Sequence, residues 1–379
     1  MPTPDERALA RVRHAVRGVL APAEPGATVL VACSGGADSL ALAAAAVAEA
    51  PGPGVRVLGV TVDHGLQDDS AEVAATAVAR LAALGVDETL TARVAVEADG
   101  SGPEAAARRA RYAVLGQVAA STGATLVLLG HTRDDQAETV LLGLTRGSGG
   151  RSVAGMRRSW TEEVGPGGTA TTWARPLLDL GREDTEATCR ALDLPWWSDP
   201  HNDDPRFLRS RVRRSVLPAL EAELGPGVAT TLARTGEQLR GDMELLDLLA
   251  DELGSRAARG PAGTDPDAGG DPDAGGDAGG DDGADGADGA DGADGADGAG
   301  APVGPAYDVA TLAAAPGPLR RRVLHRAALA AGAPAAELAH VHVLGAEALV
   351  VDWHGQRWAD LPGPLRVVRR GALLRFTRP

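Results

Sequence analysis

The stretch of sequence that decides the fold is Thr28–Ser39, which reads TVLVACSGGADS. Its first six residues form a short apolar run typical of a buried strand, and an alanine-rich helical pattern follows from Ser39. A strand, a glycine turn and a helix N-terminus in this order form an anion site, because the exposed amides and the helix dipole favour negative charge. We therefore predict a phosphate-binding loop made of Ser34, Gly35, Gly36, Ala37, Asp38 and Ser39.

Asp38 is the one residue of this loop that does not suit a phosphate ligand. Its carboxylate repels phosphate unless a cation lies between the two groups. Mg²⁺ takes carboxylate and phosphate oxygens together. The loop therefore predicts a bound Mg²⁺ with Asp38 as its protein ligand.

Outward from the loop, short apolar runs alternate with longer segments of helical spacing. The runs cover residues 55–62, 88–96 and 125–130, and the expected helices cover residues 39–49, 70–84, 103–121 and 134–144. Strands that alternate with helices are typical of a doubly wound parallel sheet, so we predict an α/β fold. We expect this first domain to occupy residues 1–215.

The remainder, residues 216–379, is predicted as a smaller and mainly helical domain. Residues 217–259 have helical periodicity, a basic helix is expected around 319–324, and the final segment is expected to be β. Residues 261–300 interrupt this domain and contain no apolar side chain larger than alanine. Such a segment buries too little surface to offset the entropy of ordering, so we predict a flexible acidic linker.

Composition excludes several classes of protein. The 37 positive residues are all arginine, so a Walker A lysine and a pyridoxal Schiff base are excluded. Two cysteines without a CxxC spacing exclude a disulfide framework and a cysteine-rich metal site, and indicate a reducing cytoplasm. No membrane segment or signal peptide is predicted.

The net charge of −15 at first argues against a polyanionic partner. Twelve aspartates of the 261–300 segment account for most of it, and removing them from the total leaves −3 on the other 339 residues. The predicted folded parts are therefore nearly neutral and remain compatible with a nucleic-acid partner.

Further motifs identify a family. The SGGxDS pattern resembles the PP-loop ATP pyrophosphatase superfamily, whose members cleave ATP between its α and β phosphates to adenylate a substrate. The other motifs are VDHGL at 62–66, EAAAR at 104–108, HTRDDQAET at 131–139, RGSG at 146–149, RPLL at 175–178 and WSDPHND at 197–203. This series resembles the tRNA(Ile)-lysidine synthetase family, and residues 318–324 and 352–355 look similar to its actinobacterial members.

The resemblance implies an ATP-dependent ligase that joins free L-lysine to C2 of the wobble cytidine in the CAU anticodon of tRNA(Ile). The cytidine is adenylated, AMP and diphosphate are released, and lysidine is formed. It further implies a C-terminal tRNA-binding region, a cytoplasmic location and a monomer or homodimer. In one departure from the family, Gln67 stands where an arginine is usual, and Arg93 could supply the lost contact.

Four residues carry the predicted chemistry. Asp38 and Arg108 are expected to stabilise charge at the reacting phosphate, Arg108 because it matches the family's phosphate-contacting arginine. Asp135 and Glu138 lie three positions apart on one helix face, so both can hold and deprotonate the lysine amine, although such a pair is often surface charge. At the ends of successive strands, Asp63, His64 and His131 are expected to line the ATP crevice, although isolated histidines are commonly bonded to backbone.

Two arginine clusters are the predicted tRNA contacts. A chain without lysine can grip phosphates only with arginine, and guanidinium groups also stack on bases. An arginine run is equally often a solvated helix face. The predicted residues are Arg206, Arg209, Arg211, Arg213 and Arg214 in one cluster and Arg320, Arg321 and Arg322 in the other.

Two alternatives remain open at this stage. Another PP-loop enzyme, such as a tRNA thiolase or an amide-forming nucleotide synthetase, would share the loop. Thiolases generally rely on cysteine pairs or a cluster, which isolated Cys33 and Cys189 do not provide. A non-catalytic adenine-nucleotide sensor would keep the loop but would not need Asp38, Asp135 and Glu138.

Overall fold

The computed structural model describes residues 1–63, 70–94, 103–146, 149–165, 167–198, 204–260 and 301–378. The chain divides into two units, Met1–Met243 and Glu244–Pro379. His64, Gln67 and the predicted 261–300 linker lie outside the described residues. None of the described helices combines the length and the apolar character that a membrane crossing needs.

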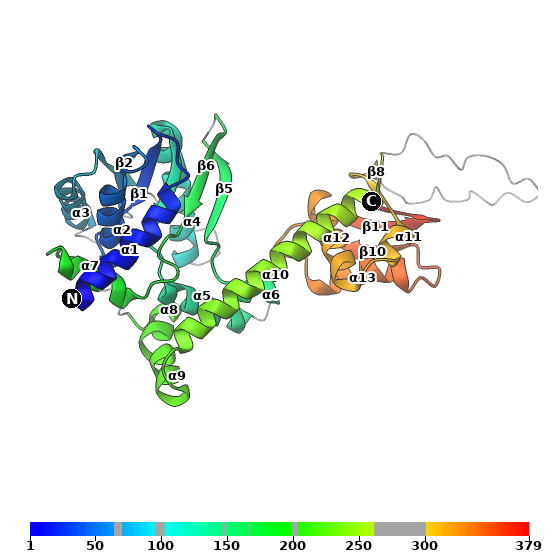
Figure 1. The fold of residues 1–379 in the computed structure, drawn as a ribbon. Helices are drawn as coiled ribbons and strands as arrows, with labels where there is room; N and C mark the ends of the chain where they lie inside the picture. Colours follow the sequence, from blue (N-terminus) through cyan, green and yellow to red (C-terminus); the bar gives the residue numbers. More distant parts are fainter. Residues whose placement is uncertain are drawn as a thin grey trace, which may run out of the picture. The chain divides into compact units, whose positions relative to one another are not determined.

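A six-stranded sheet forms the centre of the first unit (Figure 1). Its strands are β1 (Thr28–Ala32), β2 (Arg56–Asp63), β3 (Glu88–Arg93), β4 (Ala124–Leu129), β5 (Ser159–Val164) and β6 (Thr169–Ala174), in the order β3-β2-β1-β4-β6-β5. Every neighbouring pair is parallel except β5 and β6, which are antiparallel. This arrangement confirms the predicted α/β class and places β1, which leads into the glycine loop, in the middle of the sheet.

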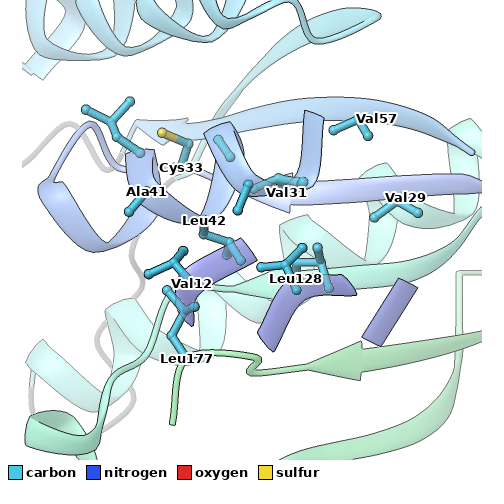
Figure 2. Close-up of a cluster of buried hydrophobic side chains, with 14 of the residues drawn as sticks. Val12, Val29, Val31, Cys33, Ala41, Leu42, Val57, Leu128 and Leu177 are labelled. Atoms are coloured by element: carbon cyan, nitrogen blue, oxygen red, sulfur yellow. The ribbon is translucent and has the colours of Figure 1, made fainter. Parts of the chain in front are cut away.

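Helices cover both faces of this sheet. The helices in this part of the chain are α1 (Pro4–Leu20), α2 (Ala37–Glu49), α3 (Ser70–Leu84), α4 (Pro103–Thr122), α5 (Arg133–Arg146), the short α6 (Gly150–Val153) and α7 (Arg182–Ala191). Residues of α1, α2, α3 and α7 join the core on one face and residues of α4 join the core on the other, while α5 packs against α6. Alternate residues of β1 point to opposite sides, since Val29 and Val31 join a core with α1 and α2 while Leu30 joins one with α4. Figure 2 shows the first of these cores, in which Val12 and Leu42 lie close to Leu128. Burial on both faces explains why these strands read as continuous apolar runs.

The first unit continues beyond the predicted boundary at residue 215. The helix α8 (Leu208–Arg211), a π-helical turn η2 (Val212–Val216), α9 (Leu217–Leu224) and the start of α10 (Val228–Ala257) follow the sheet. Val212 and Leu217 are buried against Ala137 of α5, and Leu232 of α10 joins the same cluster. The division therefore falls later, at Met243, because the sequence pattern did not show that these helices pack on α5.

The second unit combines helices with an antiparallel sheet. Its helices are the end of α10, α11 (Val309–Ala313), α12 (Gly317–Ala330) and α13 (His340–Val351). Its strands are β7 (Ala258–Arg259), β8 (Ala301–Pro302), β9 (Ala306–Asp308), β10 (Trp358–Leu361), β11 (Leu365–Arg370) and β12 (Leu373–Arg378). The order is β10-β11-β12-β9-β7, with β8 also pairing with β12.

The β-structure expected at the C-terminus is confirmed, but the sheet is larger than a mainly helical domain implied. Strands of two or three residues, such as β7 and β9, are too short to show alternation in sequence. Leu253 and Leu324 from the helices and Val367 and Phe376 from the sheet share one core. All four are nearly fully buried, so helices and sheet form a single packed unit.

Candidate active site

The glycine turn joins β1 to α2 at the carboxyl edge of the parallel sheet. Gly35 has a φ of +82°, a conformation that favours glycine, and a Cβ there would lie 3.3 Å from the Cβ of Ala77. The Ser39 hydroxyl accepts a hydrogen bond from the Ser34 amide at 3.2 Å and donates to the Gly36 carbonyl at 2.9 Å. No side chain in the described part of the chain caps α2 at Gly36. The first amides of the helix are thus left for a ligand, as an anion site requires.

Asp38 lies in the first turn of α2 and faces a second carboxylate. The Thr185 hydroxyl donates a hydrogen bond to its Oδ1, and Arg182 Nε lies 3.8 Å from its Oδ2. Burial, together with the negative charge of Asp135, raises the pKa of Asp38 to about 6 despite these partners. The site therefore destabilises the ionised form of Asp38, and a cation bound beside the carboxylate would stabilise that form.

Asp135 and Glu138 lie on α5 and form one cluster with Arg209 and Arg213. We call these four side chains the carboxylate–arginine cluster. Arg209 Nε donates to Glu138 at 2.8 Å and Arg213 Nε at 2.6 Å, and each arginine also donates to Asp135 Oδ1 at 3.2 Å. Glu138 is fully buried. Both of its oxygens are occupied, so it orients the two guanidinium groups.

Asp135 remains ionised in this cluster. Burial by itself would raise its pKa, but Arg209, Arg182 and the amide of Thr132 hold the pKa of Asp135 below its ordinary value. Its Oδ2 accepts from the Thr132 amide at 2.8 Å and its Oδ1 faces the arginines. An anion held in this way suits binding of an ammonium group better than accepting its proton.

His131 follows β4 and is held neutral by its surroundings. Burial, with the adjacent charge of Arg175, lowers the pKa of His131 to about 3, although Asp135 acts in the opposite direction. Arg175 Nε donates to His131 Nδ1 at 3.2 Å, which leaves the imidazole proton on Nε2. The ring can therefore donate one hydrogen bond from Nε2.

Arg175 is itself fixed by an aromatic cluster. It donates to Tyr112 Oη at 2.8 Å and to the carbonyl of Arg157, and its guanidinium lies 4.5 Å from the ring centre of Trp160. Tyr112 and Trp160 both pack against Trp173. These contacts lock the orientation of Arg175 and, through it, that of His131.

The structure brings several predicted residues together and leaves others apart. Asp38, Asp135 and Glu138 are linked through Arg182 and Arg213. Arg108 is exposed on α4, where its guanidinium lies 5.2 Å from the Tyr112 ring and 3.4 Å from Tyr112 Oη.

At the end of β2, the carboxylate of Asp63 is buried, and Arg93 Nε lies 3.7 Å from it. The guanidinium of Arg93 therefore lies at the end of β2. Its contact with a phosphate, in place of the arginine that Gln67 replaces, stays a prediction. His64, the next predicted residue, is not described.

The predicted tRNA arginines fall into different surroundings. Arg209 and Arg213 face the carboxylates of α5, as described above. Arg206 is exposed and pairs with Asp204, and Arg211 donates to the carbonyl of Pro205. Arg214 also has an interaction partner. The run is therefore divided between the candidate active site and the surface.

The second cluster, on α12, is tied into its own unit. Arg320 is 8% exposed, and it donates to Glu347 at 2.9 Å and to the carbonyls of Leu312, Ala313 and Ala315. Arg321 pairs with the same Glu347 and Arg322 pairs with Asp247. Arg320 is therefore buried and fully engaged within its own unit, whereas the tRNA contacts of Arg321 and Arg322 stay predictions.

Arg320 should instead prove structural. We expect Arg320→Met to destabilise the second unit by about 3 kcal/mol, because it leaves the buried carboxylate of Glu347 with a single partner. Arg366→Met, at a partly exposed ion pair with Asp360, is the matched control and should cost under about 1 kcal/mol. Urea unfolding measures both. Equal midpoints for the two variants would show that the Arg320 network adds no stability.

Sequence reasoning missed Thr185, Arg182 and Arg175 as site residues. Arg175 is the first residue of the RPLL motif at 175–178, but the motif alone did not indicate a role for its side chain. Thr185 lies 147 positions from Asp38, and nothing in its local sequence marks it. Only the packing of α7 against α2 and α1 brings it to the loop.

Comparison with known proteins first defines the class. The family model of the PP-loop domain matches residues 8–220, more than half of the chain. The fold agrees with a solved U34-tRNA thiolase NcsA from Methanococcus maripaludis, with a TM-score of 0.51 at 19% identity, covering 62% of this chain and 80% of that one. The first unit is therefore a PP-loop, ATP-using domain.

Relatives over nearly the whole chain then identify the family. The chain is 45% identical to the tRNA(Ile)-lysidine synthase of Thermobifida fusca, with 94% of both chains covered. It is 46% identical to that of Leifsonia xyli, covering 94% of this chain and 91% of the relative, and 44% identical to that of Salinispora tropica, covering 98% and 97%. The chain belongs to the tRNA(Ile)-lysidine synthase family of ATP-using ligases.

Proposed function

We propose that this protein uses ATP to join L-lysine to C2 of the wobble cytidine in the CAU anticodon of tRNA(Ile), forming lysidine with release of AMP and diphosphate. The relatives named above carry this activity in their names. Within the structure, the proposal depends on the proximity of a phosphate-binding element and an ammonium-binding carboxylate. An uncapped phosphate loop and an ionised carboxylate, Asp135, meet at the same edge of the sheet.

In the first step, the cytosine O2 attacks the α phosphorus of ATP and diphosphate leaves. The amides at the start of α2 hold phosphate oxygens, with the hydroxyls of Ser34 and Ser39 beside them. Arg182, which lies 3.8 Å from Asp38, and Arg209 and Arg213, which Glu138 orients, are guanidinium groups of this site and stabilise the developing negative charge. Arg108, whose side chain is exposed on α4, is the further guanidinium that we propose for phosphate contact.

In the second step, the ε-amine of lysine attacks C2 and AMP leaves. Asp135 binds the incoming ammonium, because it is ionised and its carboxylate is held by Thr132. Its lowered pKa makes it a poor base. The proton therefore passes to water.

The residues present also fit a Mg²⁺ ion. Within the described ranges, no three His, Cys, Asp or Glu side chains converge as a complete protein cage. Mg²⁺ in nucleotide sites takes one or two carboxylates together with phosphate oxygens, and Asp38 in the first turn of α2 would provide a carboxylate. When bound, the ion would neutralise charge on the phosphates of ATP.

The thiolase alternative is less well supported by the cysteines. Burial raises the pKa of the Cys33 thiol, and it raises that of Cys189 to about 12. Both cysteines are buried, and neither is activated as a thiolate. The likeness to the thiolase NcsA shows a shared fold alone.

Labelled lysine tests the proposal directly. Purified protein with Mg²⁺, ATP and tRNA(Ile) bearing CAU should incorporate label into the tRNA, in proportion to the AMP released. A tRNA with the CAU changed to GAU is the control and should take up no label. Absence of incorporation from lysine, with incorporation from a sulfide donor, would establish the thiolase reading instead.

A further inference from the structure

In the described part of the second unit, the helices pack on one face of the sheet and none packs on the other. Leu361, Val367 and Phe376 point to the face covered by α12 and α13, where they join the core. Side chains alternate along a strand, so their neighbours point the other way. The opposite face is therefore formed by Trp358 and Asp360 of β10, Arg366, Val368 and Arg370 of β11, and Leu373, Arg375 and Thr377 of β12, of which only Thr377 is buried. We call this the open face.

Strand register places an aromatic ring and an arginine in one row across the open face. Trp358 pairs with Val368, and Val368 pairs with Arg375. Two residues further along the same pair of strands, Arg370 lies opposite Leu373 on this face. With about 4.8 Å between strands, the row from Trp358 to Arg375 spans roughly 10 Å, which lets one ligand touch both ends.

The tryptophan is available for stacking. Trp358 is 47% exposed, an unusual state for the largest apolar side chain. The guanidinium of Arg366 lies 5.1 Å from its ring centre and is held there by a 2.8 Å hydrogen bond to Asp360. The indole is thereby fixed in place at the edge strand of the sheet.

The arginines of the open face differ from those of α12. Arg320, Arg321 and Arg322 are occupied by carboxylates, whereas Arg370 and Arg375 make no hydrogen bond or ion pair through their side chains with any residue in the described ranges. Unpaired guanidinium groups beside an exposed indole complement a polyanion that carries aromatic rings.

We propose that the open face is an RNA-binding surface, on which Trp358 stacks with an unpaired base and Arg370 and Arg375 contact the adjoining phosphates. Base stacking on an aromatic platform with flanking arginines is how proteins hold single-stranded RNA. The occupant is an unpaired segment of the substrate tRNA, so the inference rests on the proposed function. The proposal assigns the tRNA contact of the second unit to its sheet rather than to the arginines of α12.

Affinity for the tRNA, measured by fluorescence anisotropy with the full-length protein, tests this surface. Trp358→Ala should weaken binding roughly 5- to 100-fold, as expected for loss of one stacked base. Trp358→Phe should retain most of the affinity. Arg375→Gln should flatten the plot of log affinity against log salt by about 0.7 to 0.9, because one phosphate contact is lost.

Arg256→Gln is the matched control, since it removes one exposed arginine from α10 in the same unit. It should leave both the affinity and the salt slope unchanged. If Trp358→Ala and Arg375→Gln bind the tRNA like the unmodified protein, or if they alter only self-association, the open face is not an RNA surface. Lysidine formation by the unmodified protein separates this outcome from failure of the proposed function, which would abolish lysine incorporation in every variant.

Discussion

Replacing Asp38 with asparagine should abolish AMP formation and at the same time raise the melting temperature of the protein near neutral pH. Asparagine keeps an oxygen that can accept the hydrogen bond from Thr185 but carries no charge. The variant loses the carboxylate that we propose for Mg²⁺, so we expect turnover to fall by at least about 1,000-fold. A substitution that raises stability and abolishes activity identifies a residue that serves function at a cost in stability.

The pH dependence of this gain follows from the pKa of Asp38. That pKa is about 6 in the folded protein and 3.8 ordinarily, so the folded state binds the proton more tightly. The free energy of unfolding therefore falls as the pH rises from about 4 to about 6, and the loss persists above that range. Two pKa units correspond to at most about 3 kcal/mol, and we expect 1 to 2 kcal/mol after solvent screening.

Thermal melting at pH 7.5 and pH 4.5 measures this effect. Asp38→Asn should melt several degrees above the unmodified protein at pH 7.5 and close to it at pH 4.5. Asp179→Asn, at an exposed ion pair with Arg158, is the control and should give no such gain at either pH. A lower melting temperature for Asp38→Asn at pH 7.5 would show that the ionised carboxylate stabilises the fold.

The strand, the glycine turn and the helix start around Gly35 could be predicted from the sequence because everything that defines them is local. The strand, the glycines and the helix start lie within twelve residues, and the structure has the predicted elements, with β1 at Thr28–Ala32 and α2 from Ala37. The predicted i, i+3 relation of Asp135 and Glu138 is local in the same way, and both do lie on α5.

The partners of these residues could not be predicted, because they depend on long-range packing. An arginine run such as residues 206–214 shows charge but not the surface that each guanidinium faces. Arg209 lies 71 positions from Glu138, and the packing of Val212 and Leu217 on α5 turns it toward the carboxylates. The sequence therefore predicted positive charge in this segment, but it could not separate a tRNA surface from a buried cluster.

Glu138→Gln should destabilise the first unit and also reduce lysine transfer, whereas Asp135→Asn should mainly reduce lysine transfer. Glu138 is fully buried and receives hydrogen bonds from Arg209 and Arg213 at 2.6 to 3.1 Å. Neutralising it leaves two guanidinium groups close together with less compensating charge, at a cost of about 3 to 5 kcal/mol. Asp135 keeps its hydrogen bond from Thr132 as an asparagine oxygen, so its loss costs less.

A double-mutant cycle separates structure from chemistry in this cluster. Removing Arg213 as well, in Glu138→Gln with Arg213→Gln, should recover about 1 kcal/mol or more of the lost stability, because the uncompensated positive charge is gone. Lysine transfer should remain low in the double variant, since Arg213 no longer stabilises the reacting phosphate. For Asp135→Asn, the KM for lysine should rise by about tenfold or more while the KM for ATP changes little. Additive stabilities in the cycle would mean that Glu138 and Arg213 do not interact, and an unchanged KM for lysine would remove Asp135 from the lysine site.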